Sequence, residues 1–117
     1  MIRARVNIKP LSVNKCFQGR RFKTPDYKRY EQLVLLALSE HRAMYSVPDK
    51  TPLKLMLCIG VSSKNQDLDN VCKPFLDILQ KNYGFNDRYI YEIELKKEDV
   101  PKGEEYIEFE VIALCNS

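Results

Sequence analysis

The sequence lacks the features that mark membrane, secreted and zinc-thiolate proteins. No run approaches the ~20 apolar residues of a membrane span, and residues 1–6 lack the apolar core of a signal peptide. The four cysteines are widely separated and form no Cys-x-x-Cys pair, which argues against a zinc site or a dense disulfide framework. We therefore expect a cytoplasmic protein with reduced thiols and no membrane partner.

The sequence has one histidine and no internal repeats. His41 is the only histidine, and its place on a helical apolar stripe favours a packing role over that of a general base. The chain has 117 residues, of which 44% are hydrophobic and 30% charged, as in ordinary globular proteins. These properties predict one domain, residues 1–117.

Charge is distributed unevenly along the chain. Residues 1–30 carry nine Lys or Arg against Asp26 alone, a net charge of +8, whereas the remainder carries ten against fifteen acids, a net charge of −5. A basic segment joined to an acidic remainder suits a protein that binds a polyanion with one part and metal ions with the other. A basic solvated loop is the alternative interpretation.

Hydrophobic periodicity predicts two strands and a helix in the first half of the chain. Apolar and polar residues alternate over residues 2–9, as in a strand with one buried face. Thr24-Pro25-Asp26 is typical of a helix start, and apolar residues then recur at three and four up to about Met44. Residues 53–61 are apolar on both sides, which indicates a central strand.

The second half predicts another helix and two more strands. A helical stripe follows Leu68 and stops by Gly84, although Pro74 requires either a regular helix that begins near it or a bend. Strands over residues 89–96 and 106–114 complete the chain. The order strand-helix-strand-helix-strand-strand predicts an α+β fold of two layers, one mixed four-stranded sheet packed by two helices.

Residues 11–23 show no sustained period and predict a long loop. Arg20 and Arg21 stand between Phe17 and Phe22, so the cations could follow a phosphate backbone while the rings stack on bases. The rings could equally pin the loop to the core. The candidate DNA-binding residues are Asn14, Lys15, Arg20, Arg21 and Lys23.

The most unusual stretch is Asp67-Leu68-Asp69-Asn70-Val71-Cys72-Lys73. Carboxylates and an amide this close together are hard oxygen ligands, which Mg²⁺ accepts together with a substrate phosphate. The alternative is a capped helix start with a solvated polar face, because Asp and Asn favour helix N-termini. A calcium loop is excluded, since the glycine at position six and the glutamate at position twelve are missing. Asp87 lies in the turn before the third strand.

These placements resemble the RusA family of Holliday junction resolvases, which are small endonucleases borne by phages and prophages. The resemblance covers almost the whole chain, from Pro10-Leu11-Ser12-Val13-Asn14 to the turn at Asn86-Asp87. Its core is the pattern Asp67-x-Asp69-Asn70-x-x-Lys73-Pro74-x-x-Asp77, which is specific at this spacing in so short a chain. Many family members have Asp-Asp where this chain has Asn86-Asp87.

The resemblance implies a site and a reaction. Asp67, Asp69 and Asp87 would bind Mg²⁺, with Mn²⁺ as a substitute, and Lys73 would be essential for cleavage. Asn70 would support a ligand carboxylate, and Asp77 would hold the Lys73 ammonium, although a surface salt bridge explains Asp77 equally well. The protein would act as a homodimer that cuts two opposed strands of a four-way DNA junction in recombination and repair, in the cytoplasm of a bacterial or phage-infected host cell.

Two rival functions stay open at this point. A different magnesium-dependent nuclease, acting on flaps or single strands, would use the same carboxylates. A nucleic-acid-binding module without catalysis would explain the basic start of the chain, but not three acids gathered beside a lysine, because bare carboxylates repel DNA.

Overall fold

A computed structural model of the chain describes residues 2–12, 17–18, 22–39, 50–63 and 66–114. Two helices and a mixed four-stranded sheet form the body of the molecule, and a short two-stranded ribbon precedes the first helix. The α+β fold class and the order of the main elements are therefore confirmed. In chain order the elements are β1 (Ile2–Val6), β2 (Phe17–Gln18), β3 (Phe22–Lys23), α1 (Pro25–Ala37), β4 (Leu53–Val61), α3 (Leu68–Tyr83), the 3₁₀ turn η2 (Asp87–Tyr89), β5 (Ile90–Asp99) and β6 (Tyr106–Ala113).

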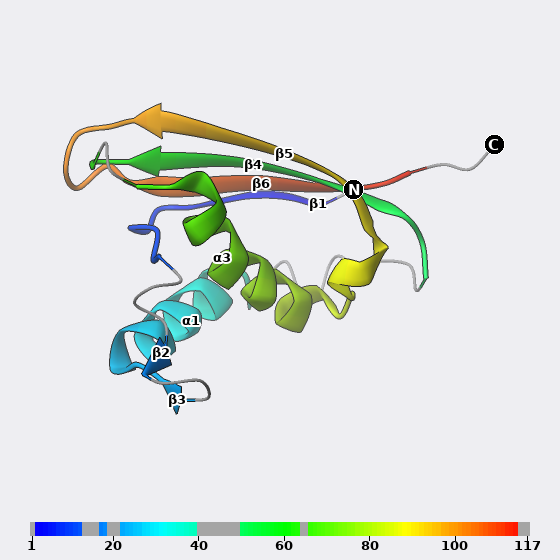
Figure 1. Ribbon diagram of the computed structural model, residues 1–117, viewed down its shortest axis with the longest axis horizontal. Coiled ribbons are helices and arrows are strands. Elements are labelled where there is room, and N and C mark those ends of the chain that lie inside the picture. Colours follow the sequence, from blue (N-terminus) through cyan, green and yellow to red (C-terminus); the bar gives the residue numbers. More distant parts are fainter. Residues whose placement is uncertain (1, 13–16, 19–21, 40–49, 64–65, 115–117) are drawn as a thin grey trace.

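The sheet has the strand order β1-β6-β4-β5. Strand β4 pairs antiparallel with β6 and parallel with β5, so it is the central strand that its two-sided apolarity predicted. Both helices lie on the same side of the sheet (Figure 1). Because one helical layer covers one face, the alternate residues Leu55, Leu57 and Ile59 of β4 are buried beneath it.

The predicted start of α1 is confirmed in detail. Thr24 is the N-cap, its side-chain oxygen accepts a hydrogen bond from the Tyr27 amide at 3.2 Å, and Pro25 opens the first turn. Helix α1 ends at Ala37 with Leu38 as its C-cap, and Ser39, whose hydroxyl donates to the Leu36 carbonyl at 2.9 Å, is again helical. The predicted continuation to about Met44 falls beyond Ser39, outside the described residues. His41 lies outside the described residues.

Helix α3 runs in one piece from Leu68 to Tyr83 with Pro74 inside it, so the alternative in which the regular helix begins near Pro74 is wrong. Gly84 ends the helix in the left-handed conformation, with φ at 73°, as predicted. The apolar side of α3 is buried against the sheet. Phe75 contacts the ring of Phe109 on β6 edge to face, with 5.6 Å between centroids.

Two predictions about strands need correction. Residues 17–18 and 22–23 pair as the antiparallel ribbon β2-β3, within the stretch expected to be loop throughout. Two-residue strands are too short to leave a periodic pattern in the sequence. Strand β5 continues to Asp99, beyond the predicted end at residue 96, because β4 pairs with it as far as Val61 opposite Asp99.

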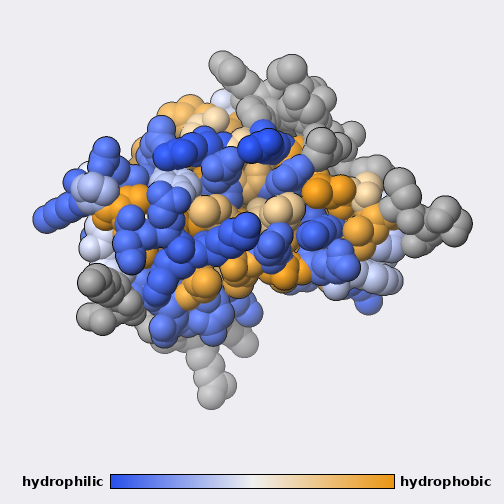
Figure 2. Space-filling view, turned by 90° about the horizontal axis from the view of Figure 1, so that it is seen from above, coloured by the Kyte–Doolittle hydropathy of each residue, from blue (hydrophilic) through white to orange (hydrophobic). Residues whose placement is uncertain are grey.

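The face of the sheet opposite the helices is mainly hydrophilic, with apolar side chains interspersed (Figure 2). Charges of both signs alternate across it, and Arg3 forms an ion pair with Glu108 at 3.4 Å. An exception is Tyr106, whose buried ring lies against Gly60 and beneath the guanidinium of Arg5, 3.9 Å from the ring centroid. This face is therefore a charged surface exposed to solvent.

Candidate active site

The start of α3 presents two aspartates that do not cap it. Asp67 occupies the N-cap position in extended conformation, yet its side chain makes no capping hydrogen bond. Instead the Asn70 side-chain amide donates to Asp67 Oδ2 at 3.4 Å, the contact expected if Asn70 supports a ligand carboxylate. Asp69 Oδ1 accepts the Asn70 backbone N–H at 3.0 Å. Both carboxylates are exposed to solvent, and neither caps the helix.

Charges alternate along the flank of α3 after Asp69. Lys73 and Asp77 follow at intervals of four, one helical turn apart. Burial raises the pKa of the Asp77 carboxyl above its ordinary value, the nearby Lys73 ammonium opposes this, and the Asp87 carboxylate adds to it. Asp77 is thus electrostatically coupled to both Lys73 and Asp87.

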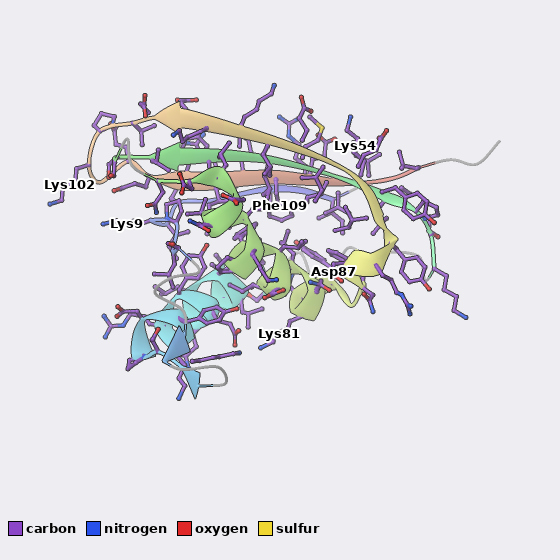
Figure 3. All side chains as sticks on the ribbon, viewed as in Figure 1. Lys9, Lys54, Lys81, Asp87, Lys102 and Phe109 are labelled. Carbon is purple, nitrogen blue, oxygen red and sulfur yellow. The ribbon has the colours of Figure 1, made fainter. Side chains whose placement is uncertain are left out.

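Asp87 lies at the other end of α3. Its backbone N–H donates to the Gln80 side chain at 2.9 Å, and the Gln80 amide donates to Asp77 at 3.4 Å. From Asp69 to Gln80 the helix rises about 16 Å, at ~1.5 Å per residue. Figure 3 shows Asp87 toward the opposite end of the molecule from Lys9.

Within one chain, the three predicted metal ligands therefore lie in two separate places. Asp67 and Asp69 stand together at the start of α3, but Asp87 does not join them. In the described ranges, no group of three or more His, Cys, Asp or Glu side chains is placed to hold a metal ion. The ligand role of the three aspartates stays a prediction.

Comparison with protein-family models matches the chain to Endodeoxyribonuclease RusA over residues 7–111. The chain belongs to the RusA family. No curated protein matches it. The match spans the start of α3, Lys73 and Asp87, and family membership assigns the chain to the endodeoxyribonucleases. Within the described part of the chain, none of the helices has the length and apolarity to cross a bilayer.

A hollow of about 410 Å³ lies beside the aspartate end of α3 in this RusA-family chain. Gln66, which precedes Asp67, forms part of its wall and donates to the Pro10 carbonyl at 3.5 Å. The Lys97 ammonium donates to the Gln66 carbonyl at 3.3 Å. The hollow is lined by Lys9, Pro10, Leu11, Ser12, Asp26, Val61, Ser62, Ser63, Gln66 and Glu105.

A lysine pair joined by one glutamate connects the ribbon to both helices. Glu31 on α1 accepts from Lys23 on β3 and from Lys81 on α3, each at 3.0 Å. Burial would raise the pKa of Glu31, but the two ammonium groups hold it below its usual range. Lys23 also lies 5.2 Å from the centroid of the Tyr27 ring, so this predicted DNA contact is held by structural partners.

The remaining predicted DNA contacts, Asn14, Lys15, Arg20 and Arg21, lie outside the described residues. Sequence reasoning missed two residues of the site region, Gln80 and Glu31. Their types carry no motif, and only the contacts across α3 and between the helices reveal them.

Cys72 lies between the charged positions but is not a nucleophile. Burial first, and then the Asp69 and Asp77 carboxylates, raise the pKa of its thiol to about 11. The thiol is neutral near pH 7 and packs in the core. The exposed charged side chains at this end of α3 are Asp67, Asp69 and Lys73.

Proposed function

We propose that this RusA-family chain is a magnesium-dependent endonuclease that acts as a homodimer and resolves four-way DNA junctions by paired, symmetric strand cleavage. The observation that carries the proposal is that the side chains of Asp67 and Asp69 do not cap α3. Both carboxylates are exposed, and each accepts a hydrogen bond from Asn70. A helix start made only for stability would turn its N-cap carboxylate onto the backbone N–H groups.

The residues at the start of α3 fit a magnesium ion. Mg²⁺ keeps several waters and is held by one or two carboxylates plus a substrate phosphate, which matches Asp67 and Asp69. When bound, such an ion polarises the scissile phosphate and lowers the pKa of an attacking water. Asn70 keeps the Asp67 carboxylate oriented through its hydrogen bond.

Lys73 supplies a positive charge one turn beyond Asp69. Its exposed ammonium can meet the phosphate oxygens on which negative charge grows in the transition state. Asp77 lies one turn further along the same helix, where the Lys73 ammonium opposes the burial that raises the pKa of the Asp77 carboxyl. The first quarter of the chain carries a net charge of +8, which favours association with the DNA backbone.

The test is cleavage of an end-labelled synthetic four-way junction and of a matched linear duplex in Mg²⁺. The proposal expects paired nicks at symmetric positions in the junction alone. Asp69→Asn should abolish them while retaining or improving junction affinity, because it removes a negative charge near phosphate. Glu104→Gln, an exposed charge change in the turn before β6, is the matched control and should cut normally.

Other outcomes would redirect or overturn the proposal. Binding of the junction without cleavage in either Mg²⁺ or Mn²⁺ would contradict the enzymatic claim. Preferential cutting of a flap or a single strand would indicate a nuclease of different selectivity. A large loss of binding in Asp69→Asn would contradict the metal role of that carboxylate.

Arg20 and Arg21 give an independent test of DNA binding. Replacing Arg20 and Arg21 together by Ala should weaken junction binding and flatten its dependence on salt, since fewer counterions are released. Lys23→Ala should change the salt dependence less, because the Lys23 ammonium is already paired with Glu31. Equal effects of both changes would contradict this division of roles.

A further inference from the structure

The hollow of about 410 Å³ beside the start of α3 adjoins the predicted metal ligands. Its lining comes from segments far apart in the sequence: the chain after β1, the first turn of α1, the end of β4 and the turn before β6. Gln66 belongs to its wall and is bonded to Asp67, and consecutive Cα atoms are only about 3.8 Å apart. Figure 3 shows Lys9, which lines the hollow, at the end of the molecule where β4 ends and α3 begins. A nucleotide whose phosphate meets Asp67 and Asp69 therefore has its base within reach of the hollow.

Hydrogen bonds hold the walls of the hollow in place. The Gln66 side-chain amide donates to the Pro10 carbonyl at 3.5 Å, and the Lys97 ammonium donates to the Gln66 carbonyl at 3.3 Å. At the end of β4, the Val100 N–H donates to the Val61 carbonyl at 2.8 Å. The hollow is thus formed before any ligand enters it, as sites for small ligands usually are.

The hollow combines apolar and polar walls. Pro10 and Val61 are buried and Leu11 is half-buried, whereas Lys9 and Ser62 are exposed. Its volume falls within the range of ~300–1,000 Å³ that is typical of small-ligand clefts. A flat heteroaromatic ring fits such a hollow, because its faces can contact the apolar residues while its polar edges meet the exposed ones.

The charges around the hollow favour a base over a phosphate. Among the described residues that line it, the cation Lys9 stands against the acids Asp26 and Glu105, a net charge of −1. This net charge opposes the entry of a phosphate. Carboxylates accept hydrogen bonds from the exocyclic amines of bases, which adenine, cytosine and guanine carry and thymine lacks. The lining therefore suits a base that bears an amine.

Glu105 is held in position to accept such an amine. Its Oε2 accepts the Ser62 hydroxyl at 2.7 Å, and its Oε1 accepts the Gly103 N–H at 2.8 Å. The hydrogen bond from Ser62 first, and then backbone hydrogen bonds and the Lys9 charge, lower the pKa of the Glu105 carboxyl. Because each carboxylate oxygen can accept a second hydrogen bond, Glu105 can bind an amine and keep both of these contacts.

We propose that this hollow binds one unstacked, amine-bearing base of the strand to be cut, with Glu105 accepting from its amine while the adjoining phosphate lies at Asp67 and Asp69. This inference rests on the proposed magnesium nuclease and adds a base-selective subsite to it. Extruding a base costs least where stacking or pairing is already weakened. The branch point of a four-way junction, where the strands exchange partners, is such a place, so the subsite also favours a junction over a continuous duplex.

Fluorescence of 2-aminopurine tests the extrusion without reference to cleavage. This amine-bearing base is quenched when stacked, and the described residues that line the hollow include no aromatic ring that would quench it there. The probe is placed in turn at each position flanking the branch point, in the absence of divalent metal. At one of these positions, wild-type protein should raise its emission by roughly threefold or more. Ser63→Leu, which narrows the hollow at an exposed residue, should bind the junction without this rise.

The base at that position tests the role of Glu105. Among junctions that differ only in that base pair, the one with thymine should be nicked about tenfold more slowly in a single turnover than those with an amine-bearing base. Glu105→Gln should reduce this discrimination to roughly threefold or less, because an amide can also donate to the oxygens of thymine. Glu104→Gln is the matched control: Glu104 lines a different hollow, so its variant should keep the discrimination.

The subsite and the nuclease fail in different ways. If no position brightens, or if the rise persists in Ser63→Leu, the subsite is overturned and the nuclease stands. Equal nicking of all four bases by the wild type, or unchanged discrimination in Glu105→Gln, overturns the selection of the base by Glu105. A rise that Ser63→Leu removes, in a protein that cuts no junction in Mg²⁺ or Mn²⁺, supports the subsite and overturns the proposed function.

Discussion

Gly60 offers the sharpest prediction about the fold. It lies on β4 opposite Tyr106, and a Cβ added there would overlap two carbons of the Tyr106 ring. The ring has little freedom to withdraw, because its hydroxyl donates to Glu98 and the Arg5 guanidinium covers its face. Gly60→Ala must therefore displace a buried aromatic side chain from a set of specific contacts.

The magnitude follows from two opposed effects. Overpacking a core contact costs about 1–3 kcal/mol. Replacing a strand glycine by alanine stabilises the protein by about 0.5–1 kcal/mol, because alanine loses less conformational freedom on folding. The net loss of unfolding free energy should be about 1–2 kcal/mol, or roughly 4–10 °C in Tm.

Urea denaturation followed by circular dichroism measures this loss. The control is Gly60→Ala in a Tyr106→Ala background, where the added methyl group meets no ring and should be neutral or slightly stabilising. The difference between the two backgrounds is the interaction energy of the methyl group with the ring. Equal stability of Gly60→Ala and wild type would refute the packing described for this face.

Two further predictions concern α1. Thr24→Ala should lower the unfolding free energy by about 1 kcal/mol through loss of the N-cap hydrogen bond, and Thr24→Ser, which keeps the hydroxyl, should lose much less in the same urea titration. Glu31→Gln should cost about 1 kcal/mol near pH 7. Folding lowers the pKa of Glu31, so its ionic contribution to stability is complete above the ordinary value of 4.5 and disappears as the pH falls through the lower, folded value. The unfolding free energies of the two proteins should therefore converge as the pH is lowered below that range.

Local sequence signals predicted most of the fold. The Thr24-Pro25 start of α1, the glycine end of α3 and the central position of β4 each follow from a rule that acts within a few residues. The ribbon β2-β3 and the full length of β5 were not predicted, because both depend on pairing between strands rather than on periodicity.

Motif spacing predicted only part of the arrangement of the candidate site residues. The pattern from Asp67 to Lys73 predicted correctly that these residues lie together, since they share the first turns of one helix. Spacing gave no information about the distance to Asp87, which depends on α3 continuing unbroken through Pro74. Gln80 and Glu31 were missed because their contacts join elements far apart in the sequence.

The most direct test of the nuclease is a supercoiled plasmid that extrudes a cruciform, incubated with the wild-type protein in Mg²⁺. Coordinated cuts on opposed strands at the base of the cruciform should give linear DNA, while the same plasmid without the cruciform should stay supercoiled. Failure to linearise the cruciform plasmid in Mg²⁺ or Mn²⁺, or equal cutting of both plasmids, would contradict the account.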